Sequence, residues 1–342
     1  MPPSKAQSGK RSPRTSTNHT SPVQARIDVV IKTGVATSLF VSKDGSTQFS
    51  AIQQAVDSIP ATNAQWVRIH VSPGIYREKV TISKAFVLLE GEGQAQTSIE
   101  WDDFEVKEGN VKGLPPRNTN ETATLFIKTT DFMARHITFK NTYDGGNDTA
   151  PAVAVQVLGD RVAFYDCGFV SVQDTLSDLT GKHYYKDCLL EGAIDFIFGY
   201  GISVFQGCEL RTVQLPPGRS PGFITAQGRD SPADHTAFVF KECTVGGITP
   251  VYLGRAWRAY SQVFFYRTIM SNIIVPWGWD VWNAKGNEAT LFLVESECTG
   301  PGSDRSGRVP WSKGLSSTDP EVVKYLNPAY NDDDLWIEAQ PQ

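Results

Sequence analysis

Apolar residues along the chain follow two different periods. From residue 41 to residue 60 they recur every three or four positions, at Phe49, Ile52, Val56 and Ile59. This spacing predicts one short amphipathic helix that ends before Pro60. Downstream, short runs rich in β-branched and aromatic residues alternate with Gly, Pro, Asn and Asp, and they predict strands at 66–71, 79–82, 86–89, 124–127 and 136–139. No helical stretches alternate with these strands, which argues against a doubly wound α/β fold.

A repeat of about 20 residues runs through the middle of the chain. Four segments share an aromatic residue, two further residues and then Cys, at 164–167, 185–188, 205–208 and 240–243. The longer interval before the fourth segment leaves room for a loop at 212–222. Short strands repeating at this interval indicate a parallel β-helix with one repeat per coil, because the Leu/Asn consensus of leucine-rich repeats is absent. Equivalent positions of successive coils would then stack about 4.8 Å apart.

The cysteines are expected to form an inward ladder of small apolar groups. A disulfide between Cys167 and Cys188 is sterically allowed at this spacing, but we expect buried free thiols. The total of five cysteines leaves at least one unpaired within the chain. No CxxC or HxxxH spacing occurs, so the sequence predicts no metal site.

Two acidic residues share one position of the repeat. Asp174 follows Cys167 by seven residues, and Asp195 follows Cys188 by the same number. Carboxylates stacked on neighbouring coils do not both ionise easily, so one can donate a proton while the other acts as a nucleophile. Two other interpretations stay open at this point, since Asp is common in turns and paired carboxylates also serve retaining glycosidases.

Two further segments carry candidate chemistry. Arg255 could orient one of the acids, and Trp257 offers a flat face for a sugar ring. Residues 218–222 match the Gly-x-Ser-x-Gly pattern of a serine nucleophile elbow, but Pro221 lacks the backbone N–H that this elbow needs after the serine. We therefore interpret that segment as a loop.

Composition and charge narrow the possible partners. None of the 342 residues belongs to an apolar run of about 18, so we expect no transmembrane helix. Residues 1–27 carry five basic and no acidic side chains, which leaves 27 basic and 37 acidic side chains and a net charge of −10 on the remainder. An acidic body argues against nucleic acid as a partner. We interpret residues 1–36 as a disordered tail and 37–342 as one domain.

Several ordered motifs are similar to those of the plant pectin methylesterase (pectinesterase) family. They are Gly-Ile-Tyr-Arg-Glu at 74–78, Gln-Asp-Thr-Leu at 173–176, Asp-Phe-Ile-Phe-Gly at 195–199, Leu-Gly-Arg-Ala-Trp at 253–257, Gly-Trp-Asp-Val-Trp-Asn at 278–283, and Glu295 followed by Thr-Gly-Pro-Gly at 299–302. The resemblance implies an all-β, right-handed parallel β-helix with a short N-terminal capping helix. It also implies hydrolysis of the C6 methyl esters of homogalacturonan.

The resemblance assigns a role to each matching residue. Asp195 would be the nucleophile, and Asp174 would be the proton donor and acceptor. Gln173 would stabilise the oxyanion. Arg255 would hold Asp195 and contact substrate, and two further residues, Trp257 and Thr119, would also bind substrate. No cofactor or metal is implied.

Two positions depart from the family pattern. Pro151 stands where the family has a Gln that donates to the oxyanion or substrate, and the loss of one such donor costs about 10²–10³ in rate. Gln156 is a candidate replacement donor. Ala256 replaces the usual Pro of Gly-Arg-Pro-Trp, which is a milder change.

The resemblance also implies partners and a location. We expect a monomer that binds methylated homogalacturonan in the extracellular cell wall, with a proteinaceous pectinesterase inhibitor as a second partner. No signal peptide is visible at the N-terminus. Two alternatives remain open: a pectin-binding paralogue with weak or no catalysis, and another pectin-active β-helix enzyme such as a polygalacturonase or lyase. The signatures Gly-His-Gly and Arg-Ile-Lys of those depolymerases are absent.

Overall fold

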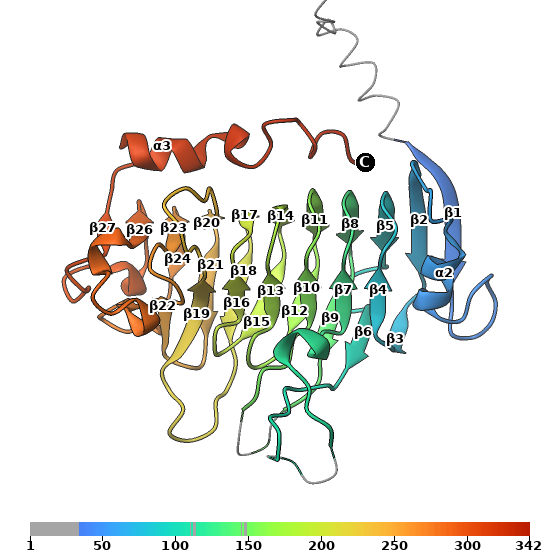
Figure 1. Ribbon diagram of the computed structural model, residues 1–342, viewed down its shortest axis with the longest axis horizontal. Coiled ribbons are helices and arrows are strands. Elements are labelled where there is room, and N and C mark those ends of the chain that lie inside the picture. The colour runs from blue at the N-terminus through green and yellow to red at the C-terminus, as the bar shows by residue number, and fades with distance from the viewer. Residues whose placement is uncertain (1–33, 110, 112–113, 145, 147–148) are drawn as a thin grey trace, which may run out of the picture.

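The computed structural model describes residues 34–342 except 110, 112–113, 145 and 147–148, and these residues form a parallel β-helix (Figure 1). Sheet A contains β1 (Val35–Val41), β2 (Trp66–Val71), β5 (Val87–Glu90), β8 (Phe132–Arg135), β11 (Val162–Tyr165), β14 (Lys182–Lys186), β17 (Ile202–Gln206), β20 (Ala237–Lys241), β23 (Gln262–Tyr266), β26 (Phe292–Ser296) and β27 (Lys313–Gly314). Sheet B contains β3 (Gly74–Arg77), β6 (Thr97–Trp101), β9 (Thr138–Asn141), β12 (Gly168–Val170), β15 (Leu189–Gly192), β18 (Glu209–Thr212), β21 (Thr244–Gly247) and β24 (Ile269–Met270). Sheet C contains β4 (Val80–Ile82), β7 (Leu125–Ile127), β10 (Val155–Val157), β13 (Leu176–Asp178), β16 (Ile197–Gly199), β19 (Gly222–Gln227), β22 (Val251–Ala256) and β25 (Trp279–Asp280). The predicted parallel β-helix is confirmed.

A sharp turn follows the strand of sheet A in each coil from β8 to β26. The turn residue has a left-handed backbone with φ between 47° and 64° at His136, Asp166, Asp187, Gly207, Glu242, Arg267 and Glu297. The residue that follows points into the core, and in four coils it is a cysteine of the repeat. All five cysteines are free thiols, as expected, and the four of the repeat are buried.

Aromatic rings stack in the core two residues before these turns. Phe164, Tyr185, Phe205, Phe240 and Phe265 lie on five successive strands of sheet A, with neighbouring ring centroids 5.3, 4.4, 4.6 and 4.5 Å apart. Their planes are within 15° of parallel. The aromatic positions of the sequence repeat therefore form a continuous buried stack that sets the register of the coils.

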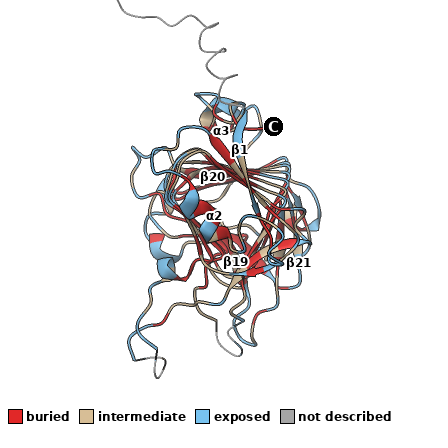
Figure 2. Ribbon diagram, turned by 90° about the vertical axis from the view of Figure 1, so that its right-hand side faces the viewer, coloured by how far each residue is buried: buried red, intermediate tan, exposed pale blue. Residues whose placement is uncertain are grey.

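The N-terminal end of the coil is closed by α2 (Ile52–Ser58), which lies across the opening in the end view (Figure 2). The helix buries Ile52, Ala55 and Val56 against the core. The carboxylate of Glu78 accepts hydrogen bonds from the backbone N–H groups of Ile52 and Gln53 at 2.9 and 3.0 Å. Glu78, from the Gly-Ile-Tyr-Arg-Glu motif, thus caps the predicted helix.

The C-terminal segment runs back along sheet A (Figure 1). It contains α3 (Pro320–Leu326) and η5 (Pro328–Tyr330), while the other 3₁₀ turns of the described residues are η1 (Thr119–Thr122), η2 (Trp282–Ala284), η3 (Glu288–Thr290) and η4 (Pro301–Ser303). The Tyr325 hydroxyl donates to Gln262 at 2.8 Å, and the Asn331 amide donates to the carbonyl of His183 at 2.6 Å. This segment therefore covers the outer face of several middle strands.

A small cluster of polar side chains around Asp178 is buried inside the coil. Asp178 occupies the position that Val157 holds on the preceding strand of sheet C. Its carboxylate accepts from Tyr185 and Ser203 at 2.7 Å each and lies 3.0 Å from Nδ1 of His183. Burial alone would lower the pKa of His183. The charge of Asp178 and its hydrogen bond to the ring have the larger effect, so the pKa of His183 is raised. Each polar group is paired, which makes its burial tolerable.

The predicted element positions agree with the structure apart from small shifts. β2 covers the predicted range, whereas Phe86 and His136, which we placed in strands, have left-handed backbones just before β5 and β9. The predicted tail at 1–36 falls mainly on residues 1–33, which lie outside the described part, and β1 includes its last two residues. Over the described residues no helix has the length and apolar character needed to cross a membrane.

Candidate active site

Asp174 and Asp195 lie side by side on adjacent coils. A bridge pairs Gln173 with Ile194, and β13 pairs with β16 in the same register, so the two acids occupy one position of the repeat. The backbone N–H of Asp174 donates to the carbonyl of Ile194 at 3.0 Å. Both acids have left-handed backbones, with φ of 62° and 46°, at the point where the chain enters sheet C. Asp accepts this conformation more readily than most residues, and the turn directs both carboxylates outward.

Arg255 binds one of the two acids. From β22, its Nε and Nη2 donate to the two carboxylate oxygens of Asp195 at 2.8 and 2.5 Å. Asp195 is only 6% exposed. Such a two-point contact fixes both the plane and the charge of the carboxylate. No hydrogen bond joins the side chain of Asp174 to another residue of the described chain.

The two carboxyl groups differ in their electrostatic surroundings. Burial raises the pKa of Asp174 well above its usual value near 3.8, the charge of Asp195 raises it further, and Arg255 only partly offsets this. Burial also raises the pKa of Asp195, and the hydrogen bonds and charge of Arg255 offset only part of that rise. Because Arg255 bonds to Asp195 alone, Asp174 is the member of the pair that keeps a proton more readily.

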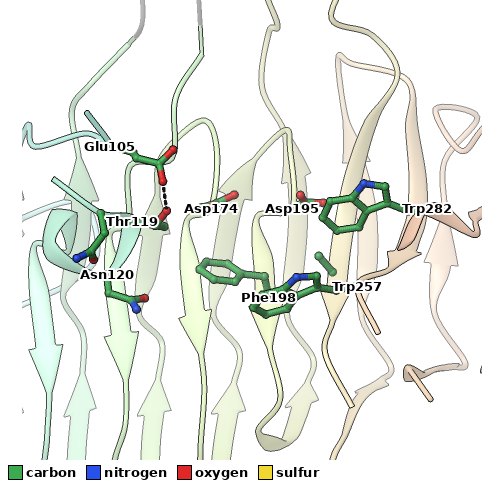
Figure 3. Close-up of a pocket in the computed structure, with 10 residues that line it drawn as sticks. Glu105, Thr119, Asn120, Asp174, Asp195, Phe198, Trp257 and Trp282 are labelled. Carbon is green, nitrogen blue, oxygen red and sulfur yellow. Dashed lines mark hydrogen bonds between the residues drawn. The ribbon is translucent and has the colours of Figure 1, made fainter. Parts of the chain in front are cut away.

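A cavity of about 410 Å³ opens over this pair (Figure 3). Its lining includes Asp174, Asp195, Trp257 and Thr119, four of the six residues predicted from sequence. The Trp257 ring lies edge-to-face with Phe198, with centroids 6.1 Å apart. In Figure 3 the acids lie at the centre, with Thr119 toward the N-terminal coils and Trp257 on the opposite side. Arg255 reaches the site through its contact with Asp195.

Gln173 faces a second cavity of about 680 Å³. Pro151 lines the same cavity, and Glu105 lines both cavities. The position that differs from the family pattern is thus next to Gln173. The candidate replacement, Gln156, lines neither cavity: its amide donates to Asn120 Oδ1 at 3.1 Å.

Sequence reasoning gave no role to the remaining residues that line the first cavity. These are Glu105, Asn118, Asn120, Phe198, Ala226 and Trp282. Strand alternation counted from Asp195 would place Ile197 outside and Phe198 inside, but the left-handed turn at Asp195 breaks the alternation, so that Ile197 lies in the core and Phe198 outside it. Ala226 lies on the outer face of β19, and the others come from turns and connections, where no periodic pattern marks them. Among the described residues, no group of three or more His, Cys, Asp or Glu side chains is arranged to hold a metal ion.

Residues 38–332 match the family model described as pectinesterase. The chain belongs to the pectinesterase family. Putative pectinesterase 10 of Arabidopsis thaliana is 43% identical over 314 residues, covering 90% of this chain and 88% of the relative. Members of this family are carboxylic ester hydrolases, as the sequence motifs predicted.

Solved pectin methylesterases share the fold of this pectinesterase. The enzyme from carrot is 29% identical, with a TM-score of 0.80 over 90% of this chain and 96% of that chain. A pectin methylesterase in complex with a hexasaccharide is 26% identical, with a TM-score of 0.73 over 85% of this chain and 96% of that chain. The β-helix prediction and the family prediction are both confirmed.

Proposed function

We propose that this pectinesterase hydrolyses the C6 methyl esters of homogalacturonan, releasing methanol and leaving a free carboxylate on the polymer. The observation that carries the proposal is the unequal acid pair: Asp174 and Asp195 are stacked in an open cavity, and only Asp195 is bonded to Arg255. This arrangement supplies a carboxylate that can act as a nucleophile beside an acid that can donate a proton.

The first half of the reaction forms an acyl-enzyme. A carboxylate oxygen of Asp195 attacks the C6 carbonyl carbon and gives a tetrahedral oxyanion, toward which Gln173 donates. The intermediate collapses, the bond from C6 to the methoxy oxygen breaks, and Asp174 gives its proton to the departing oxygen. Methanol leaves, and C6 is joined to Asp195 as a mixed anhydride.

The second half restores the enzyme. Asp174, now a carboxylate, takes a proton from a water molecule that attacks C6 of the anhydride. The bond from C6 to Asp195 breaks, so that the polymer carries a carboxylic acid and Asp195 is again a carboxylate. Arg255 orients Asp195 in both steps because its two donors match the two carboxylate oxygens.

Substrate binding is assigned to the sides of the cavity. Trp257 and Phe198 offer apolar ring surfaces to a sugar, while Thr119 and Asn120 offer polar groups. Thr119 donates to Glu105 at 3.0 Å, which fixes its hydroxyl at the cavity wall. We propose that the polymer crosses this cavity, and that the protein acts as a monomer in the plant cell wall. A proteinaceous inhibitor as second partner remains a prediction of the family resemblance.

Pro151 supports a second candidate function. It lines the cavity next to Gln173 and offers neither a side-chain donor nor a backbone N–H, so the oxyanion has one donor fewer than the family pattern supplies. The cost of about 10²–10³ in rate would leave a slow esterase, or a protein that binds pectin without turnover.

Methanol release from highly methylated pectin tests the proposal. We expect release by the wild type, loss of release in Asp195→Ala, and full release in the control Asp57→Ala, which changes an exposed acid of α2. The polymer length should stay unchanged. Pectin binding without Asp195-dependent methanol would support the non-catalytic candidate, whereas new reducing or unsaturated ends would indicate a depolymerase.

A further inference from the structure

The guanidinium of Arg255 lies between two aromatic rings. Its Cζ atom is 4.2 Å from the centroid of the Phe223 ring and 3.8 Å from that of Trp282. One edge of the same group donates to Asp195 through Nε and Nη2. Two aromatic rings and one carboxylate therefore contact the guanidinium at the same time, so a displacement of this group weakens a ring contact or a hydrogen bond.

The two rings differ in how they are held. Phe223 on β19 is paired in register with Tyr252 on β22, and their rings stack at 5.1 Å with an interplanar angle of 8°. Tyr252 is buried. Trp282 is 38% exposed and lines the cavity, whereas Phe223 is absent from the lining. Phe223 is half-buried and is held by its stacking on Tyr252, so it is the more firmly held of the two rings around Arg255.

We propose that Phe223 is a positioning residue of this esterase, which acts by holding the Arg255 guanidinium in the plane that directs the Asp195 carboxylate toward the substrate. The inference rests on the proposed function of Asp195 as nucleophile. A cation over an aromatic ring is attracted by the negative charge of the ring face, and the attraction grows when the pair is removed from water. An aliphatic side chain of similar volume fills the space but lacks this attraction.

The substitution Phe223→Leu tests the aromatic face, with Phe223→Tyr as the conservative variant. If the whole cation–π attraction between Phe223 and Arg255 is lost from the transition state, kcat of Phe223→Leu should fall by about two- to thirty-fold. We expect KM for methylated pectin to stay close to the wild-type value, because Phe223 does not line the cavity. Phe223→Tyr should restore kcat.

The pH dependence of kcat distinguishes a positioning role of Phe223 from a merely structural one. The charged groups that face Asp195 are Arg255 and Asp174, and Glu105 acts on Asp174. A loosened Arg255 stabilises the Asp195 carboxylate less, so the acidic limb of kcat should move to higher pH in Phe223→Leu. The control Phe169→Leu, a core ring of sheet B, should lower the melting temperature without moving that limb.

Two results would overturn the proposal. One is a folded Phe223→Leu variant with wild-type kcat and an unmoved acidic limb. The other is a rise in KM alone, which would mean that Phe223 contacts pectin. If the wild type releases no methanol, the proposed function fails separately. The ¹³C-carboxyl NMR titration of Asp195 then tests Phe223 without turnover, and an unchanged titration in Phe223→Leu would reject it.

Discussion

Asp174 and Asp195 share one position on adjacent coils, but Arg255 bonds only to Asp195. Backbone pairing gives the two acids equivalent positions. Arg255 places a positive charge beside Asp195 but not in hydrogen-bonding contact with Asp174. The same asymmetry predicts opposite effects of neutralising each acid on stability and a characteristic dependence of the rate on pH.

Replacing Asp174 by Asn should stabilise the protein at neutral pH. The pKa of Asp174 is raised in the folded state, so between its usual value near 3.8 and that raised value the folded protein keeps a proton that the unfolded chain releases. Stability then falls as pH rises, by up to about 1.4 kcal/mol per pH unit. Melting temperatures of Asp174→Asn and wild type should differ at pH 7 and converge near pH 3. Equal melting temperatures at pH 7 would contradict the assigned shift.

Replacing Asp195 by Asn should instead lower stability, because the loss of the two-point contact with Arg255 outweighs the relief of the burial that raises the pKa of Asp195. The change leaves Arg255 without its carboxylate, and the side chains of the pair are 20% and 9% exposed for Arg255 and Asp195. Breaking a buried pair costs about 3 kcal/mol at the lower end of the measured range, which suits the partial exposure of Arg255. Unfolding in guanidinium chloride measures the loss. A variant as stable as the wild type would show that the pair contributes no net stability.

Methanol release should show a bell-shaped dependence on pH. At low pH the rate falls because Asp195 gains a proton, and at high pH it falls because Asp174 loses the proton that it gives to the leaving group. The two apparent pKa values belong to the coupled pair. Measurement of kcat/KM from acid to alkaline pH tests this expectation. A flat profile over that range would argue against the paired-acid mechanism.

The cysteines of the native protein should resist alkylation. Burial raises the pKa of Cys188 well above its usual range and that of Cys298 to about 11. Burial alone would also raise the pKa of Cys208, but hydrogen bonds from Cys188 and Cys243 lower it; this thiol is buried with the other three of the repeat, so the reagent does not reach it in the folded protein. Iodoacetamide followed by mass spectrometry should show slow labelling of the native protein and five labelled cysteines after unfolding without reductant. Only three labels in the unfolded protein would reveal a disulfide.

The aromatic stack predicts a large effect of one core substitution. The ring of Phe240 lies between Phe205 and Phe265, so Phe240→Ala removes contacts on both faces and should cost about 3–5 kcal/mol of unfolding free energy. The control Phe40→Ala changes a ring that is 40% exposed and should cost far less. Similar decreases in unfolding free energy in the two variants would mean that the aromatic stack contributes no more to stability than an exposed ring.

The stacking of the two acids could be predicted from the sequence because residues at the same position of a repeat lie beside each other on adjacent coils. Once Cys167 and Cys188 were placed on adjacent coils, equal spacing placed Asp174 beside Asp195. The same reasoning missed Cys298, which follows the left-handed turn at Glu297. Thr268 occupies the equivalent position in the coil before it and interrupts the pattern.

The surroundings of Arg255 could not be predicted in this way. Phe223 and Trp282 lie 32 residues before and 27 residues after Arg255. Trp282 reaches its place through the connection after β25, whose path depends on tertiary packing. The buried Asp178 was equally hidden, because its position is apolar on the preceding strand and only the fold brings its partners His183 and Tyr185 beside it.

The separation between Asp174 and Asp195, the proposed proton donor and nucleophile, is set by the hydrogen bonds between neighbouring strands. It is thus a property of the backbone, which side-chain packing and loop conformation alter little. The connections that contribute Glu105, Asn118 and Arg219 to the two cavities can change in length or composition while the spacing of Asp174 and Asp195 stays constant. In such an architecture, evolution can alter which polymer is bound without having to rebuild the reaction centre.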